Sequence, residues 1–230
     1  MSPKKNKVDK GPSITGVIII AVLNGLVGAI LGFVFMSSFS AKSFASRAEF
    51  DRYLTSDDFV SANKPGSAYY FRTDPVRGRS WENKRNQLLQ GGSSQITISS
   101  AEINSWITSR FIPPSLDQVD SPIAIAPGVP NFSAQDDDQI YISIPLKVRA
   151  FGKVYNRTFF AKAHFSAVDL ILDEASVDSA RLPHRSVFMP IYEKFKDSYR
   201  FTDEYKAIAE AWQRVESVDV SSDSLKLRLR

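Results

Sequence analysis

The chain has 230 residues, two histidines, no cysteine and a formal net charge of +4. Four lysines and one aspartate fall within residues 1–13, so most of the net charge belongs to a short N-terminal tail. This composition argues against a nucleic-acid-binding domain, which needs a basic face on its folded part. It also argues against a zinc site, since the two histidines are far apart in the sequence.

An apolar segment near the N-terminus is the strongest feature of the sequence. No charged residue stands between Lys10 and Lys42, and the 23 residues from Ile14 to Met36 are predominantly apolar. At about 1.5 Å per residue, a helix of this length crosses a bilayer core of about 30 Å. The segment therefore predicts a transmembrane helix over residues 14–36.

A cleaved signal peptide is the alternative reading of this segment. Small residues stand at Ser38, Ser40, Ser43 and Ala45, where a signal peptidase would require them. The apolar run is, however, longer than that of a usual signal peptide, which has about 7–15 residues. We therefore predict an uncleaved signal anchor.

Basic residues on the two sides of the helix predict its orientation. Those before it are dense within a short tail, which favours a cytoplasmic N-terminus. We expect residues 1–13 to form a basic cytoplasmic tail in contact with anionic lipid. The C-terminal part is then periplasmic, anchored in the inner cell membrane by one span. The residues before the helix are Lys4, Lys5, Lys7 and Lys10, and those after it are Lys42, Arg47 and Arg52.

Small residues share one face of the predicted membrane helix. Gly28 and Gly32 form a GxxxG motif, and Ala21 and Gly25 form a similar pair one turn earlier. Such residues let a second helix approach closely. Asn24 lies near mid-span, where an unpaired amide is costly in lipid. This face predicts packing against other transmembrane subunits.

Residues 37–93 are expected to form a helical stalk or linker. The pattern predicts helices over 46–56 and 80–90 with a short strand at 69–71 between them. Ser46 and Glu49 have the spacing of a capping box. The sequence leaves open whether these helices belong to a stalk or to the main domain.

Residues 94–230 predict one α+β domain. A strand at 95–98 precedes a helix, for which Ser99 and Glu102 have the spacing of a capping box. The predicted buried stripe of this helix contains Ile103, Trp106, Ile107 and Phe111. From residue 140 onwards, apolar and polar residues alternate through three strands joined by short turns, which predicts an antiparallel meander. Pro145 indicates that its strand is exposed at an edge or bulged.

The C-terminal part adds two amphipathic helices, over 188–199 and 202–215, and a terminal hairpin. Alternation of Leu225, Leu227 and Leu229 with basic residues predicts that this hairpin joins the meander. The predicted fold class is α+β: a single N-terminal transmembrane helix, then an extracytoplasmic domain whose antiparallel β-meander is packed by amphipathic helices.

No combination of residues predicts catalysis, a metal site or a cofactor. His164 and His184 lie far apart and neither is near a nucleophile motif. The aspartates at 136–138 lack the glycine and terminal glutamate of a calcium loop, so a solvated turn is the simpler interpretation. We expect a protein that is not an enzyme.

A cluster of basic residues lies between residues 72 and 85, interleaved with Tyr69, Tyr70, Phe71 and Trp81. Such mixtures occur where a domain contacts a protein partner or a membrane surface. The cluster is a candidate patch for a partner or for lipid headgroups. Its members are Arg72, Arg77, Arg79, Lys84 and Arg85.

These features favour a non-catalytic, single-pass accessory or structural subunit of a larger membrane complex. Its expected partners are membrane lipid and other transmembrane subunits, without nucleic acid. The alternative is a membrane-tethered domain that binds a lipid or another hydrophobic ligand. An open apolar cleft of about 300 Å³ or more between sheet and helices would favour that alternative.

Overall fold

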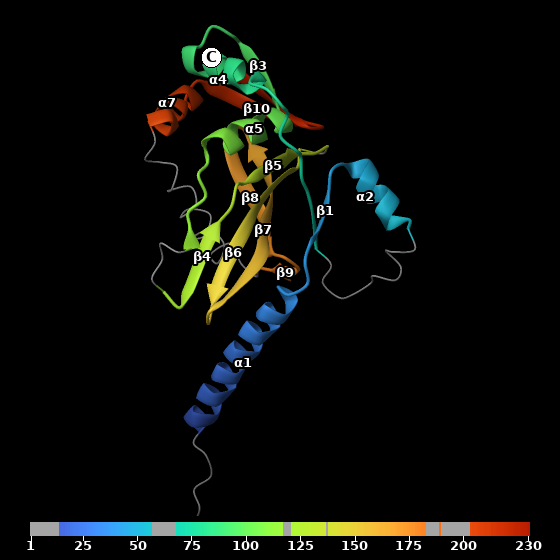
Figure 1. The fold of residues 1–230 in the computed structure, drawn as a ribbon, viewed down its shortest axis with the longest axis vertical. Coiled ribbons are helices and arrows are strands. Elements are labelled where there is room, and N and C mark those ends of the chain that lie inside the picture. Colours follow the sequence, from blue (N-terminus) through green and yellow to red (C-terminus); the bar gives the residue numbers. More distant parts are fainter. Residues whose placement is uncertain (1–13, 57–67, 117–120, 137, 183–188, 190–202) are drawn as a thin grey trace, which may run out of the picture.

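The computed structural model describes residues 14–56, 68–116, 121–136, 138–182, 189 and 203–230. A helix, α1 (Ile14–Met36), extends from one end of a domain built from antiparallel sheets and further helices (Figure 1). The predicted mixture of helices and antiparallel sheets, with one apolar helix at the N-terminus, is confirmed. The lysines of the tail and the helix predicted at 188–199 lie outside the described residues, apart from Met189.

The larger sheet has six strands and contains the predicted meander. Strands β6, β7 and β8 pair in sequence order and are antiparallel throughout, which confirms that prediction. Strands β4 and β5 both pair with the other side of β6, and β9 pairs with the free side of β8. The strands are β4 (Ile123–Pro127), β5 (Asn131–Ala134), β6 (Ile140–Ala150), β7 (Lys153–Ser166), β8 (Asp169–Val177) and β9 (Ala180–Arg181).

Pro145 lies in the middle of β6, which is a central strand and not the predicted edge. Its carbonyl accepts a hydrogen bond from Gly128 N at 2.6 Å, so this side of the residue faces the loop between β4 and β5. A proline lacks an N–H, and here no ladder partner is lost because the neighbouring strand is interrupted. Gly128 allows the close approach, since a Cβ there would lie 3.2 Å from the Pro145 oxygen.

A second sheet contains three strands, β3 (Gln95–Ser99), β10 (Val215–Ser221) and β11 (Ser224–Leu229). The terminal hairpin β10–β11 pairs through β11 with β3, more than a hundred residues earlier in the chain. The prediction that the hairpin joins the meander is therefore wrong. Alternating leucines identify a strand but do not encode which edge it pairs with.

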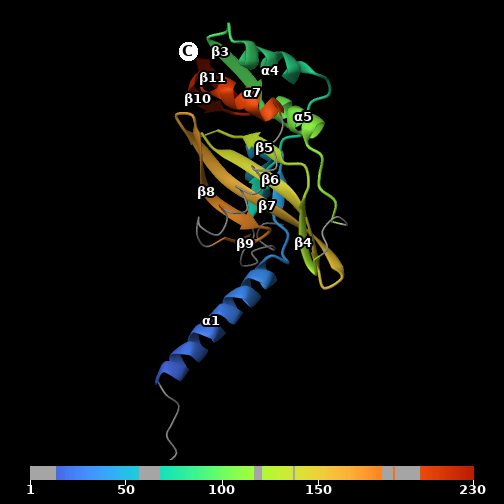
Figure 2. The ribbon, with the colours of Figure 1, turned by 90° about the vertical axis from the view of Figure 1, so that its left-hand side faces the viewer.

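Three of the described helices gather around this second sheet, at the end of the molecule remote from α1 (Figures 1 and 2). Helix α4 (Ser80–Gln90) contacts β3, α5 (Ser100–Arg110) and α7 (Asp203–Trp212). Two of these helices also contact the larger sheet: α5 contacts β5, and Trp212 of α7 lies against Phe165 of β7, with ring centroids 6.4 Å apart. One apolar core joins both sheets, with Ile140 and Phe159 on one side and Leu225 and Leu227 on the other.

A small parallel pair, β1 (Lys42–Phe44) and β2 (Tyr69–Phe71), lies beside α2 (Arg47–Leu54). Their aromatic side chains form a second cluster that includes Tyr141 of β6. The ring of Phe71 meets that of Tyr141 edge-on, with centroids 5.0 Å apart. Residues between 37 and 93 therefore contact the rest of the domain, through this cluster and through α4 among other places.

The C-terminal end of α1 is attached to the domain and not loosely tethered. Ser179 N donates to Phe39 O at 3.0 Å, Ser37 is buried, and Phe33 packs against the main core. These contacts connect the helix exit to the β8–β9 turn. The direction of α1 relative to the sheets is thereby determined by packing.

Candidate functional site

A hollow of about 640 Å³ opens at the end of the domain farthest from α1. The loop before α4, the first turn of α4 and the C-terminal half of α5 form its walls. We name it the arginine cleft, because three arginines and one glutamate are its charged residues. It is lined by Pro75, Val76, Arg77, Gly78, Arg79, Trp81, Glu82, Ser105, Thr108, Ser109 and Arg110.

Backbone contacts hold the loop of the cleft against α5. The Ser105 hydroxyl lies 2.8 Å from Val76 O and 2.7 Å from Ala101 O, and Val76 N donates to Ala101 O at 3.4 Å. Gly78 has a φ of +115°, a conformation that residues with a Cβ rarely adopt. The loop can therefore turn into α4 while Arg77 and Arg79 flank the glycine.

Two tryptophans and an arginine form the aromatic wall. Trp81 is buried, and its ring stacks on Trp106 with centroids 6.4 Å apart and planes 12° from parallel. The Arg110 guanidinium lies over the Trp81 ring, 5.6 Å from the centroid. A cation over an aromatic face is attracted by the ring quadrupole. Arg110 is thereby positioned at the rim.

Glu204, in the first turn of α7, connects α7 to α4 and α5. Its carboxylate lies 2.9 Å from Arg85 Nε and 3.1 Å from Arg110 Nε, and it accepts a 3.4 Å hydrogen bond from Trp106 Nε1. The Arg85 contact is an ion pair without hydrogen-bond alignment, because that Nε has no hydrogen-bond partner. One carboxylate thus pairs with two guanidinium groups, so the three side chains together keep one net positive charge, and it fixes the back of the aromatic wall.

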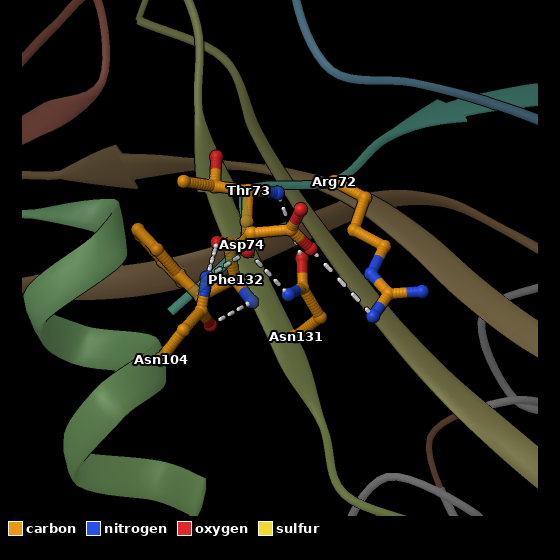
Figure 3. A network of polar contacts seen from close by, with 6 residues as sticks. All are labelled: Arg72, Thr73, Asp74, Asn104, Asn131 and Phe132. Carbon is orange, nitrogen blue, oxygen red and sulfur yellow. Dashed lines mark hydrogen bonds and ion pairs between the residues drawn. The ribbon is translucent and has the colours of Figure 1, made fainter. Parts of the chain in front are cut away.

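A buried polar network fixes α5, the helix that carries Arg110 (Figure 3). Asn104 is 1% exposed and donates through Nδ2 to Thr73 O and Phe132 O, at 2.8 and 2.7 Å. Its Oδ1 accepts from Phe132 N at 2.7 Å. Asn131 completes the network by exchanging two hydrogen bonds with the Thr73 backbone. The side chain of Asn104 therefore makes the two hydrogen bonds to the Phe132 backbone that a neighbouring strand would make with β5.

This network corrects the predicted buried stripe of the helix. Ser100, Asn104 and Ser105 are the buried residues of α5, whereas Trp106 and Ile107 are only half-buried. The helix packs polar side chains on backbone groups of β5, while Ile103 is half-buried against the main core and Trp106 stacks on Trp81 of α4. The Ser99 capping box is present, with both of its hydrogen bonds to Glu102.

The structure divides the predicted basic patch. Arg77 and Arg79 line the cleft, whereas Arg85 is directed to Glu204. Arg72 lies 3.8 Å from Asp74, beside a different hollow of about 260 Å³ (Figure 3). Lys84 is half-buried on α4.

Arg110 is the cleft residue that sequence reasoning missed. It stands 31 positions after Arg79, and a basic residue in the last turn of a helix is ordinarily explained by the helix dipole.

The charges of the cleft suit recognition of an anion. Arg79 is paired with Glu82 at 3.7 Å, while Arg77 forms no ion pair within the part of the chain that the structure describes. Guanidinium groups bind carboxylates through paired hydrogen bonds. The hydroxyls of Ser105, Thr108 and Ser109 add polar groups to the same walls. The arrangement can bind an acidic side chain or a carboxylate group.

A hollow of about 280 Å³ lies beside Tyr69, Tyr141 and Phe160. Burial, followed by the nearby Tyr69 phenol, raises the pKa of Tyr141 to about 12, so this phenol stays protonated at neutral pH. His164 Nδ1 lies 2.9 Å from Asp173 on the exposed surface of β7 and β8. No group of three potential metal ligands occurs among the described residues, and His184 lies outside them.

The predicted packing face of α1 is open to its surroundings. Ala21, Asn24, Gly25, Gly28 and Gly32 are all exposed. A Cβ added at any of the three glycines would meet nothing within 4 Å. A larger side chain there causes no clash within the monomer.

Replacing Gly28 and Gly32 by leucine is therefore expected to weaken helix–helix association without destabilising the domain that follows α1. The association is measured by native electrophoresis after extraction in a mild detergent. Leu23→Phe with Ile30→Phe adds bulk to the opposite side of α1 and serves as the control. Association that survives both leucines would assign the glycine face no packing role.

Comparison with known proteins gives no family for this chain. Neither a protein-family model nor a curated protein sequence matches it. The site is therefore interpreted from its own geometry.

Proposed function

We propose that this protein is a non-catalytic, single-pass membrane subunit whose periplasmic domain binds an acidic segment of a partner protein in the arginine cleft. One observation carries the proposal: an exposed apolar helix and a basic cleft lie at opposite ends of the molecule (Figures 1 and 2). The first end suits lipid and the second suits an anionic partner beyond the membrane.

Helix α1 supports the membrane anchor. Its segment Ile18–Met36 has a mean hydropathy of 2.6 and contains no fully buried residue, although Phe33 and Met36 are half-buried next to the domain. Large apolar side chains such as Ile30 and Leu31 are more than half exposed. An apolar surface of this extent is stable in a bilayer and not in water.

The attachment of the helix exit supports retention of the segment. Cleavage after Ala45 would remove Phe44, a buried member of the second aromatic cluster. Cleavage after Ser40 would remove Phe39 and its hydrogen bond to Ser179. A signal peptide makes no such contribution to the mature fold, so an uncleaved anchor has more support than a signal sequence.

The place of the cleft supports a protein partner over lipid headgroups. If α1 spans a bilayer, its headgroups lie at the α1 end of the domain, whereas α4 and α5, which help to line the cleft, lie towards the other end (Figure 1). The hydrophobic-ligand alternative has less support, because the 640 Å³ hollow lies at helix ends and not between sheet and helices, and three arginines and three hydroxyl groups line it beside Trp81.

The proposed topology predicts which cysteine variants an impermeant reagent reaches. The chain has no cysteine, so one introduced thiol is labelled uniquely. In spheroplasts, a membrane-impermeant maleimide is expected to label Ser222→Cys, in the exposed β10–β11 turn, but Lys5→Cys only after lysis. The reverse labelling would contradict the orientation. A mature chain trimmed near Ser40 or Ala45 would contradict the anchor.

Charge reversal in the cleft is expected to release the partner. After gentle extraction from the native membrane, the wild type should migrate in a complex, and Arg77→Glu with Arg79→Glu should migrate as a smaller species. The control is Arg47→Glu with Arg52→Glu, the same change in charge on α2. A wild-type protein that migrates alone would contradict the subunit proposal. A cleft variant that still migrates in the complex would show that the cleft is not part of the interface.

A further inference from the structure

The end of the β6–β7 hairpin, together with the start of β4, exposes a group of apolar side chains. We name this group the hairpin patch. Strand register brings Ile125 beside Val148 and Val148 beside Tyr155, on the side of the sheet that further along forms the core. The exposed fractions of its side chains are 56% for Ile123, 58% for Ile125, 87% for Phe151, 57% for Val154 and 40% for Tyr155. Val154 pairs with Arg149 and points to the opposite side of the sheet from Tyr155, so both sides of the hairpin end carry an exposed apolar side chain.

Phe151 occupies a position in the turn that ordinarily suits a polar residue or glycine. Its φ is 50°, and Gly152 follows with a φ of 76°. Two successive residues with positive φ are typical of a turn that favours Asn-Gly. A bulky side chain is strained in that conformation and here gains no packing within the chain. Packing within the folded chain therefore does not explain a phenylalanine at position 151.

Cations surround the hairpin patch and carboxylates are absent from its strands. Residues 121–127 and 144–158 include Lys147, Arg149, Lys153 and Arg157 but no aspartate or glutamate. Lys147 and Lys153 are exposed, whereas Arg157 lies 3.6 Å from Asp178. Aromatic and aliphatic side chains beside lysines are the combination that binds the interface of an anionic bilayer.

The hairpin patch lies at the same end of the molecule as the exit of α1. In both ribbon views, β6 ends and β7 begins at the height of the domain-proximal end of α1 (Figures 1 and 2). The helix is attached there through Phe39 and Ser179. A bilayer crossed by α1 would therefore have its outer headgroups at the level of the turn.

From these observations we propose that the hairpin patch inserts into the headgroup region of the membrane that α1 crosses, as a second lipid contact. Phe151 enters the interface, and Lys147 and Lys153 meet anionic headgroups. The inference rests on the proposed membrane anchor. It gives the outer domain a defined orientation on the membrane, with the arginine cleft directed away from the bilayer.

Lipid quenching of a site-specific fluorophore tests the proposal on the full chain in nanodiscs of phosphatidylcholine and phosphatidylglycerol. An environment-sensitive dye is attached to Val154→Cys, which leaves Phe151 in place. Val76→Cys, 43% exposed at the far end, is the matched control, and Leu26→Cys in α1 reports insertion. Lipids with a nitroxide near the headgroup are expected to quench the dye at position 154 several-fold more than the dye at position 76.

Two further variants sharpen the result. Adding Phe151→Asp should abolish the excess quenching at position 154, and omitting phosphatidylglycerol should reduce it. Equal quenching at positions 154 and 76, while a dye at position 26 is quenched by lipids with a deep nitroxide, would overturn the hairpin contact alone. Absence of quenching at position 26 would overturn the membrane anchor and the hairpin contact with it.

Discussion

Trp81→Ala is expected to destabilise the domain that follows α1 by about 3–5 kcal/mol, the usual cost of removing a buried tryptophan. Trp81 is 4% exposed, stacks on Trp106 and supports the Arg110 guanidinium. Its removal leaves a cavity between α4 and α5 and frees one wall of the arginine cleft. The free energy of unfolding is measured by pulse proteolysis in urea on the detergent-solubilised chain.

Trp106→Ala is the matched comparison for this result. Trp106 is only half-buried, so its truncation should cost less than that of Trp81, although it also removes the hydrogen bond to Glu204. A larger loss at Trp106 than at Trp81 would contradict the packing described for the aromatic wall.

Asn104→Leu is expected to destabilise the domain by about 2–5 kcal/mol, because each buried polar group left without a partner costs about 1–3 kcal/mol. The leucine is of similar size, but it leaves Phe132 N and Phe132 O without the bonds that Asn104 supplies. Thr73 O keeps its bond from Asn131. The same proteolysis assay measures the loss.

Two variants make the Asn104 result specific. Asn86→Leu, an exposed asparagine on α4, should change the free energy of unfolding by no more than about 0.5 kcal/mol. Asn104→Asp retains the acceptor for Phe132 N but loses both donated bonds, so it should also destabilise. A neutral Asn104→Leu would show that the network in Figure 3 does not stabilise the fold.

The difference between Asn104 and Trp106 explains why the helix was only partly predictable. Its capping box is a local pattern, and the observed helix begins where Ser99 and Glu102 predict. Which side of α5 is buried depends on what approaches it. Backbone groups of β5 approach, and they require polar partners, so an asparagine and two serines are buried in place of the expected apolar stripe.

The arginine cleft shows the same limit at the level of the site. Arg77 and Arg79 are close in sequence and were recognised as part of a basic cluster. Arg110 joins them only because Asn104 and Glu204 fix α5 against β5 and α7. No spacing in the sequence predicts that Arg110 lies beside Arg77 and Arg79. The positive φ at residue 78 is easier to predict, because glycine is the residue that most readily adopts it.

By itself, the sequence determined the apolar helix at 14–36, the three strands of the meander and the helix start at Ser99. Each of these follows from hydrophobic periodicity or from a hydrogen bond between residues a few positions apart. The tertiary structure decided that β11 pairs with β3, that the buried residues of α5 are polar, and that the arginine cleft and α1 lie at opposite ends. Those features depend on contacts between segments that are distant in the sequence. Packing and the hydrogen bonding of buried backbone groups decide which segments pair, and local sequence patterns do not predict that pairing.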